Sequence, residues 1–153
     1  MRVFLIANGQ VTEQAMLPTT LPEGGFWWVT LARREFEVLQ ADVQAMLAQL
    51  CDSRLVDLHV SDLLNNQLPS HHDFTSVYDV LVFRRLATSQ TETDLANPGQ
   101  PVHVTREGSV PKVFRRINTN PVGFAVFDRL LLSIHPTDCA VRDSYAERLL
   151  ASH

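Results

Sequence analysis

The sequence predicts an α/β fold, in which a mixed, partly antiparallel sheet has helices packed against its faces. Two observations carry this prediction. The apolar pattern switches between helical spacing, clearest in Arg33–Leu50, and short extended runs of β-branched and aromatic residues, clearest in Tyr78–Leu86. The order of segments is strands, helix, short helix, strand, polar excursion, a pair of strands and a last helix, which is typical of a layered α/β domain.

Composition indicates one ordinary globular domain spanning residues 1–153. A chain of 153 residues with 45% hydrophobic and 20% charged residues buries roughly two-thirds of the surface that it exposes when unfolded. The net charge of −4 argues against a nucleic-acid-binding module, which usually carries a basic face. Cys51 and Cys139 lie far apart without a C-x-x-C motif, so we expect small buried hydrophobes in a reducing compartment.

The N-terminal third predicts three strands. Val3–Ala7 is strand-length and ends at the turn signal Asn8-Gly9, so it is not a signal peptide, and Val11–Met16 is a candidate hairpin partner. Phe26–Leu31 is the next strand. Its adjacent tryptophans could form a stacking platform, but neighbouring residues of a strand face opposite sides of a sheet, and we favour that explanation.

Two helices are expected next. Arg33–Leu50 has one apolar stripe, with Thr30 as a candidate N-cap, and should cover a sheet face. A short helix follows, in which Leu55, Leu58 and Asp62-Leu63-Leu64 recur at helical spacing. It should end near Asn65 because Pro69 forbids its continuation, and a loop should follow.

Tyr78–Leu86 is predicted to be a central strand buried on both faces, because its apolar residues are nearly continuous. On this basis, truncation of Val82 or Phe83 to Ala should each destabilise the domain by roughly 2–4 kcal/mol. The polar segment 87–100 should be an exposed excursion, and 102–104 with 110–114 could form a small hairpin with a basic edge.

The C-terminal part predicts a hairpin and a helix. Val122–Phe127 and Leu130–Ile134 are separated by Asp128-Arg129, a two-residue connection. Thr137 or Asp138 could then cap the last helix. Its expected inward stripe is Val141, Tyr145 and Leu149.

No catalytic motif is present in the sequence. His71-His72-Asp73 is the one local cluster of potential metal ligands, but adjacent side chains diverge, and a zinc site needs three or four convergent ligands. Ser133 and His135 share a strand face without a G-x-S-x-G context, and H-E-x-x-H, P-loop and dinucleotide-binding motifs are missing. An enzyme is therefore the weaker hypothesis. The alternative is a free-standing cytosolic α/β metal-binding protein, or a metal-dependent enzyme, that uses His71, His72 and Asp73.

The stretch Asp62-Leu63-Leu64-Asn65, a Gln/Pro-containing loop, Phe74 and Tyr78 resembles the cytoplasmic domain of CorA-type divalent-cation transporters. In that family a short helix ending in such a tetrapeptide leads through a polar loop to an aromatic-rich strand. Phe26–Leu31 before a long helix and the strand pair Val122–His135 before a last helix also agree, so the resemblance spans most of the chain.

The resemblance implies a non-catalytic, cation-sensing regulatory domain of a Mg²⁺, Co²⁺ or Zn²⁺ transporter. Such domains lie at the cytoplasmic face of the cell membrane and assemble as homopentamers, with carboxylates at subunit boundaries that bind Mg²⁺ weakly. The family's carboxylate lies just after the central strand, where this chain has Ala87-Thr88-Ser89, so Glu92 and Asp94 are the substitutes for this metal site. No organic cofactor or nucleic acid is implied.

The pore of this family lies in two C-terminal transmembrane helices with a Gly-Met-Asn signature, and neither occurs in this sequence. No run of about 18 to 20 apolar residues is present, so the chain as given is not expected to cross a membrane. It stops where a stalk helix would begin. This favours a fragment cut to the cytoplasmic domain, attached to the membrane only through the missing helices.

Overall fold

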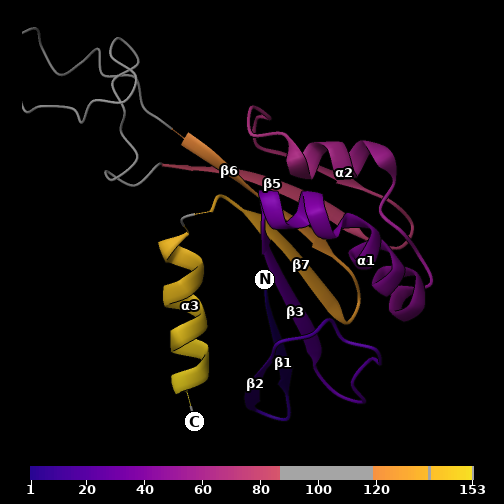
Figure 1. Ribbon diagram of the computed structural model, residues 1–153, viewed down its shortest axis with the longest axis vertical. Helices are drawn as coiled ribbons and strands as arrows, with labels where there is room; N and C mark the ends of the chain where they lie inside the picture. The colour runs from indigo at the N-terminus through magenta and orange to yellow at the C-terminus, as the bar shows by residue number, and fades with distance from the viewer. Residues whose placement is uncertain (87–118, 138, 153) are drawn as a thin grey trace, which may run out of the picture.

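The computed structural model describes residues 1–86, 119–137 and 139–152, and it confirms the mixed α/β fold (Figure 1). Within these described residues, seven strands form one sheet in the order β2-β1-β3-β7-β6-β5-β4. Their bounds are β1 Arg2–Ala7, β2 Gln10–Gln14, β3 Phe26–Ala32, β4 His71–Phe74, β5 Asp79–Leu86, β6 Thr119–Val126 and β7 Leu130–His135. Neighbouring strands are antiparallel except for β3 and β7, which are parallel.

Helices cover both faces of the sheet. The helices α1 (Arg33–Cys51) and α2 (Asp57–Leu64) pack on one face, and α3 (Ala140–Ala151) packs on the other. In Figure 1 the sheet passes between α3 on one side and α1 with α2 on the other. No helix in the described part of the chain is long and apolar enough to span a membrane.

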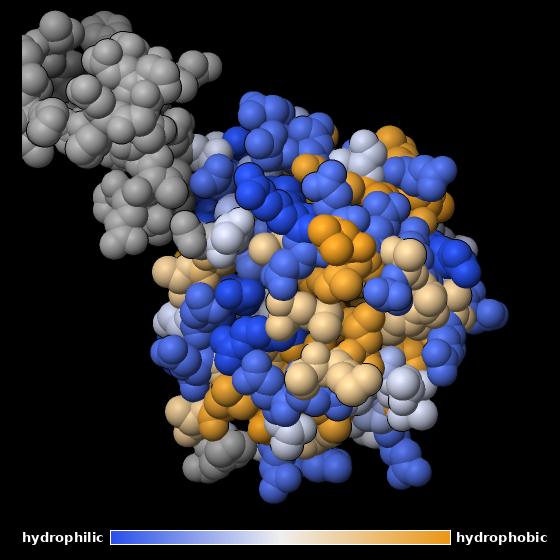
Figure 2. Space-filling model, viewed as in Figure 1, coloured by the Kyte–Doolittle hydropathy of each residue, from blue (hydrophilic) through white to orange (hydrophobic). Residues whose placement is uncertain are grey.

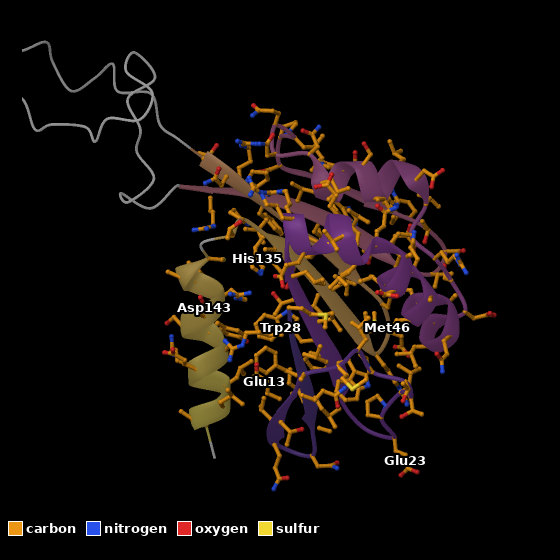
Figure 3. All side chains as sticks on the ribbon, in the orientation of Figure 1. Glu13, Glu23, Trp28, Met46, His135 and Asp143 are labelled. Atoms are coloured by element: carbon orange, nitrogen blue, oxygen red, sulfur yellow. The ribbon has the colours of Figure 1, made fainter. Side chains whose placement is uncertain are left out.

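The two tryptophans of β3 lie in the two different layers of the core, as the alternation of side chains along a strand predicts. Trp27 belongs to the large cluster under α1 and α2, whereas Trp28 belongs to the small cluster with Phe4 and Ala146 under α3. Figure 3 shows Trp28 on the α3 side and Met46 on the α1 side.

The expectation that Tyr78–Leu86 is a central strand buried on both faces is only partly right. β5 is an interior strand, since it pairs with β4 and β6, but the middle of the sheet is β7. Val80 and Val82 are buried under the helices, whereas Phe83 is 54% exposed on the opposite face. The continuous apolar run arises because Phe83 is one of several hydrophobic side chains on the partly uncovered face of the sheet.

Several local predictions are corrected. Thr30 does not cap α1, because β3 continues to Ala32 in register with β7, and Glu35 accepts the backbone N–H of Ala32 at 2.9 Å instead. In α2 the inward side chains are His59, Val60 and Leu63, while Leu58 is exposed. Residues His71–Phe74, expected in a loop, form the edge strand β4.

The last helix also differs from the prediction. α3 begins at Ala140 with Cys139 as N-cap, and Thr137 does not cap it, while Asp138 lies outside the described residues. The expected stripe of Val141, Tyr145 and Leu149 does face the sheet, since all three line a groove between the helix and the sheet, but Val141 and Tyr145 stay 64% and 56% exposed because the groove is open. The buried residue of α3 is Ala146, because only one narrow side of the helix meets the sheet. Figure 2 shows hydrophobic side chains at the surface in the middle of the view, over α1.

Candidate functional site

A groove of about 580 Å³ lies between α3 and the neighbouring face of the sheet. This volume is within the range of small-molecule pockets. Its walls are mostly apolar and come from β1, β3, β5, β6, β7 and α3, with Phe26, Trp28, Phe83, Phe124 and Tyr145 as their aromatic residues. The polar side chains in the groove are Arg85, Ser133, His135 and Arg142.

His135, the last residue of β7, closes the polar end of the groove. Its side chain is almost fully buried, with Nδ1 at 2.6 Å from the carbonyl oxygen of Pro136 and Nε2 at 2.9 Å from Nη1 of Arg142. Burial lowers the pKa of His135, and the adjacent Arg142 guanidinium lowers it further. The ring is therefore favoured in its neutral form.

Trp28 occupies the middle of the groove and explains the role of Ser133. The indole Nε1–H donates to Ser133 Oγ at 2.9 Å, while the ring stacks on Phe4 at 5.0 Å and meets Tyr145 edge-on at 5.9 Å. Ser133 and His135 do share a strand face, as the sequence predicts. The serine satisfies a buried indole and has no base bonded to it, so the pair is not a nucleophile with its base.

A second polar cluster joins α2 to β4 and to Tyr78, the residue before β5. The His59 ring is 2.8 Å from Tyr78 Oη through Nδ1 and 2.8 Å from Asp73 Oδ2 through Nε2. Tyr78 Oη also accepts the backbone N–H of Val56, the N-cap of α2, at 2.9 Å. The Asp73 carboxylate can only accept, so it takes a hydrogen bond from His59 Nε2–H, and Nδ1 of the neutral ring then accepts the Tyr78 hydroxyl proton, which gives each group of the cluster a partner.

The structure places His72 on the opposite face of β4 from His71 and Asp73, so the three candidate ligands do not converge. Because they are consecutive residues of β4, their side chains alternate between the faces: His71 lies 3.5 Å from Asp62 on α2, and His72 lies 3.6 Å from Asp79 on β5. Asp73 is engaged by His59, which lowers the pKa of this carboxyl. Among the described residues, no group of three or more His, Cys, Asp and Glu side chains could hold a metal ion.

The predicted metal ligands Glu92 and Asp94 lie outside the described residues. Sequence reasoning missed two pairs that the structure brings together, His59 with Tyr78 and His135 with Arg142. The sequence does indicate that His59 faces inward, because it lies four residues after Leu55 and four before Leu63, on the apolar side of the short helix. The second pair depends on the angle at which α3 leaves the sheet, which the sequence does not specify.

The sequence matches no protein family and no curated protein. Solved structures, however, align with nearly the whole chain. The cytoplasmic domain of ZntB from Vibrio parahaemolyticus aligns with a TM-score of 0.61 and 12% identity over 99% of this chain and 50% of that one. Full-length CmaX aligns with a TM-score of 0.59 and 17% identity over 99% of this chain and 39% of that one. The soluble domain of CorA from Methanocaldococcus jannaschii aligns with a TM-score of 0.55 and 11% identity over 99% and 46%.

The chain therefore has the fold of CorA-like soluble domains, which confirms the resemblance seen in the sequence. It spans half or less of the length of the chains it matches. At these identities the likeness establishes the fold, while the assignment of sites depends on the residues of this chain.

Proposed function

We propose that this chain is the soluble cytoplasmic domain of a CorA-like divalent metal ion transporter and that it serves in cation sensing. The observation that carries the proposal is the alignment of 97–99% of the chain with structures described as the ZntB cytoplasmic domain, the CorA soluble domain and the CorA magnesium transporter. Because the alignment covers nearly the whole chain rather than one motif, it supports a common architecture. Neither the sequence nor the described geometry offers a catalytic constellation that would favour an enzyme instead.

The cation to be sensed is Mg²⁺ or another hard divalent ion, held by Glu92 and Asp94. Mg²⁺ prefers oxygen ligands, keeps several of its waters and can be bound by one or two carboxylates. A pair of carboxylates from one chain makes a weak site, and a weak site can respond to changes in millimolar Mg²⁺. In this proposal the site is completed between the subunits of a homopentamer, with a partner carboxylate from a stalk helix, at the cytoplasmic face of the membrane.

Calorimetric titration of the chain with Mg²⁺ and, separately, with Zn²⁺ tests this proposal. Expected results are millimolar or undetectable Mg²⁺ binding and no stoichiometric Zn²⁺ binding. Any Mg²⁺ heat should disappear in Glu92→Gln with Asp94→Asn. The matched control is Glu37→Gln with Asp42→Asn, which removes the same two charges from the exposed side of α1 and should change nothing.

Two outcomes would count against the proposal. Tight stoichiometric Zn²⁺ binding that is lost in His71→Ala with His72→Ala would favour the metal-binding alternative. Mg²⁺ binding that is as strong in the Glu92 and Asp94 double variant as in the unaltered chain would remove these residues from the site.

A further inference from the structure

We propose that His135 and Arg142 form a pH-sensitive latch, which holds the start of α3 against the sheet and opens when His135 is protonated. His135 ends β7, and Arg142 lies in the first turn of α3. Figure 3 shows His135 beside the end of α3 that carries Asp143. The latch is independent of the proposed transporter function, because it depends only on contacts within this chain.

The hydrogen bonds fix the protonation state of the ring in the closed latch. Nδ1 faces the carbonyl oxygen of Pro136 at 2.6 Å, and a carbonyl can only accept, so Nδ1 carries the proton. Nε2 faces Nη1 of Arg142 at 2.9 Å, and a guanidinium can only donate, so Nε2 must offer its lone pair. Neutral His135 in this one tautomer satisfies both partners.

Protonation removes the acceptor that Arg142 needs. The imidazolium carries an N–H at both nitrogens, so Nε2–H would point at the N–H of Arg142 and two positive charges would meet. Arg142 can leave without losing all of its partners, because its Nε and Nη2 contact Asp143 Oδ1 at 2.7 Å. The bond between the helix and the strand is thus the one that breaks.

Other charged groups around the ring raise or lower the pKa of His135. Asp143 of α3 and Glu35 of α1 favour the imidazolium, although Glu35 is itself held by the Met1 amine and by the N–H of Ala32. Arg85 of β5 lines the same groove and is a further positive charge on that side. Burial of the ring, together with Arg142, outweighs these carboxylates and the Pro136 carbonyl, so the pKa of His135 is lowered in the closed state.

α3 is the element that should respond, because the rest of its docking is sparse. Ala146 is its one fully buried residue in the described structure. Its other contacts include the edge-on meeting of Tyr145 with Trp28 and the ion pair of Asp143 with Arg2 at 3.7 Å. An element with so few buried contacts can open while the sheet stays folded.

The sign of the effect follows from linkage. Above the ordinary histidine pKa of about 6.5 the ring is neutral whether α3 is docked or not, so pH has no effect through this group. Below it the undocked state takes up a proton that the docked state resists, so docking weakens as the pH falls towards the lowered pKa. The opening constant of α3 rises about tenfold for each unit by which docking lowers the pKa.

Hydrogen exchange of residues 140–151 between pH 7.5 and 5.5, corrected for the intrinsic pH dependence of exchange, tests the latch. In the unaltered chain the opening constant of α3 should rise roughly threefold or more over this range. The amides around Val43 and Leu47, two buried residues of α1 on the opposite face of the sheet, serve as the internal reference. Their exchange should not change with pH after the same correction. Arg142→Met should open α3 more at every pH and flatten the pH dependence.

Two further variants separate the latch from general effects of charge and of folding. Arg148→Met removes the same charge from an exposed position in the last turn of α3. This variant should keep the full rise of the opening constant between pH 7.5 and 5.5, which we call the pH step. His135→Asn, which cannot titrate, should abolish the step. A pH-independent opening in the unaltered chain, or a step of the same size in Arg142→Met, would overturn the proposal even if His135→Asn failed to fold.

Discussion

Two neighbouring residues of β5 should lose different amounts of stability on truncation, although the sequence predicts equal effects. Val82 is 2% exposed on the side of α1 and α2, whereas Phe83 is 54% exposed on the other side. The perturbation is the pair of single substitutions Val82→Ala and Phe83→Ala. Both shorten a side chain on the same strand and leave the pairing of β5 with β4 and β6 in place.

The magnitudes follow from burial. Val82→Ala removes two buried methyl groups, a transfer loss of about 1.6 kcal/mol, and the cavity left in a packed layer raises this to about 2–3 kcal/mol. Phe83→Ala loses roughly half of the transfer energy of a phenylalanine, about 1 kcal/mol, and leaves no closed cavity. Its edge-on contact with Phe124, at 6.2 Å between ring centroids, adds roughly 0.5 kcal/mol. Val82→Ala should therefore cost about 1 kcal/mol more.

Urea denaturation followed by circular dichroism measures both free energies of unfolding, with unchanged m-values as the check that the transition remains two-state. Val38→Ala is the matched control, because Val38 is 82% exposed on α1, and its loss should change stability by no more than about 0.5 kcal/mol. A Phe83→Ala variant less stable than Val82→Ala would refute the reasoning. It would mean that the groove side of β5 is covered in solution.

Two further substitutions test the packing and hydrogen bonding of α2. Gly123→Ala should cost about 1–3 kcal/mol, because a Cβ there would lie 2.5 Å from Leu63 Cδ2, and Leu63→Ala in the same chain should make the combined loss smaller than the sum. Additive losses in the double-mutant cycle would contradict this. Tyr78→Phe should cost about 2–3 kcal/mol, because it leaves the Val56 N–H and the buried His59 Nδ1 without their partner. A loss below about 0.5 kcal/mol in urea denaturation would show that water replaces the hydroxyl.

The types of the helices and most strands could be predicted because their signals are local. Arg33–Leu50 has one apolar stripe along its whole length, and it forms α1 with nearly the same bounds. Trp27 and Trp28 fall on opposite faces because strand geometry alone requires it. The similarity to CorA-like soluble domains was also visible, since it rests on the order of these segments and on the tetrapeptide that ends α2.

Only the tertiary structure decided which apolar face is covered and which polar groups meet. The sequence shows that Val82 and Phe83 are both hydrophobic, but not that α1 and α2 cover only the side of Val82. The apolar pattern of a strand can be read from that strand alone, whereas burial also depends on which other element packs against it. For the same reason His71, His72 and Asp73 are adjacent in the chain yet point to different partners. His135 meets Arg142 because β7 and α3 bring them together in one particular orientation, and hydrogen-bond geometry, not residue type, then makes the pair sensitive to a proton.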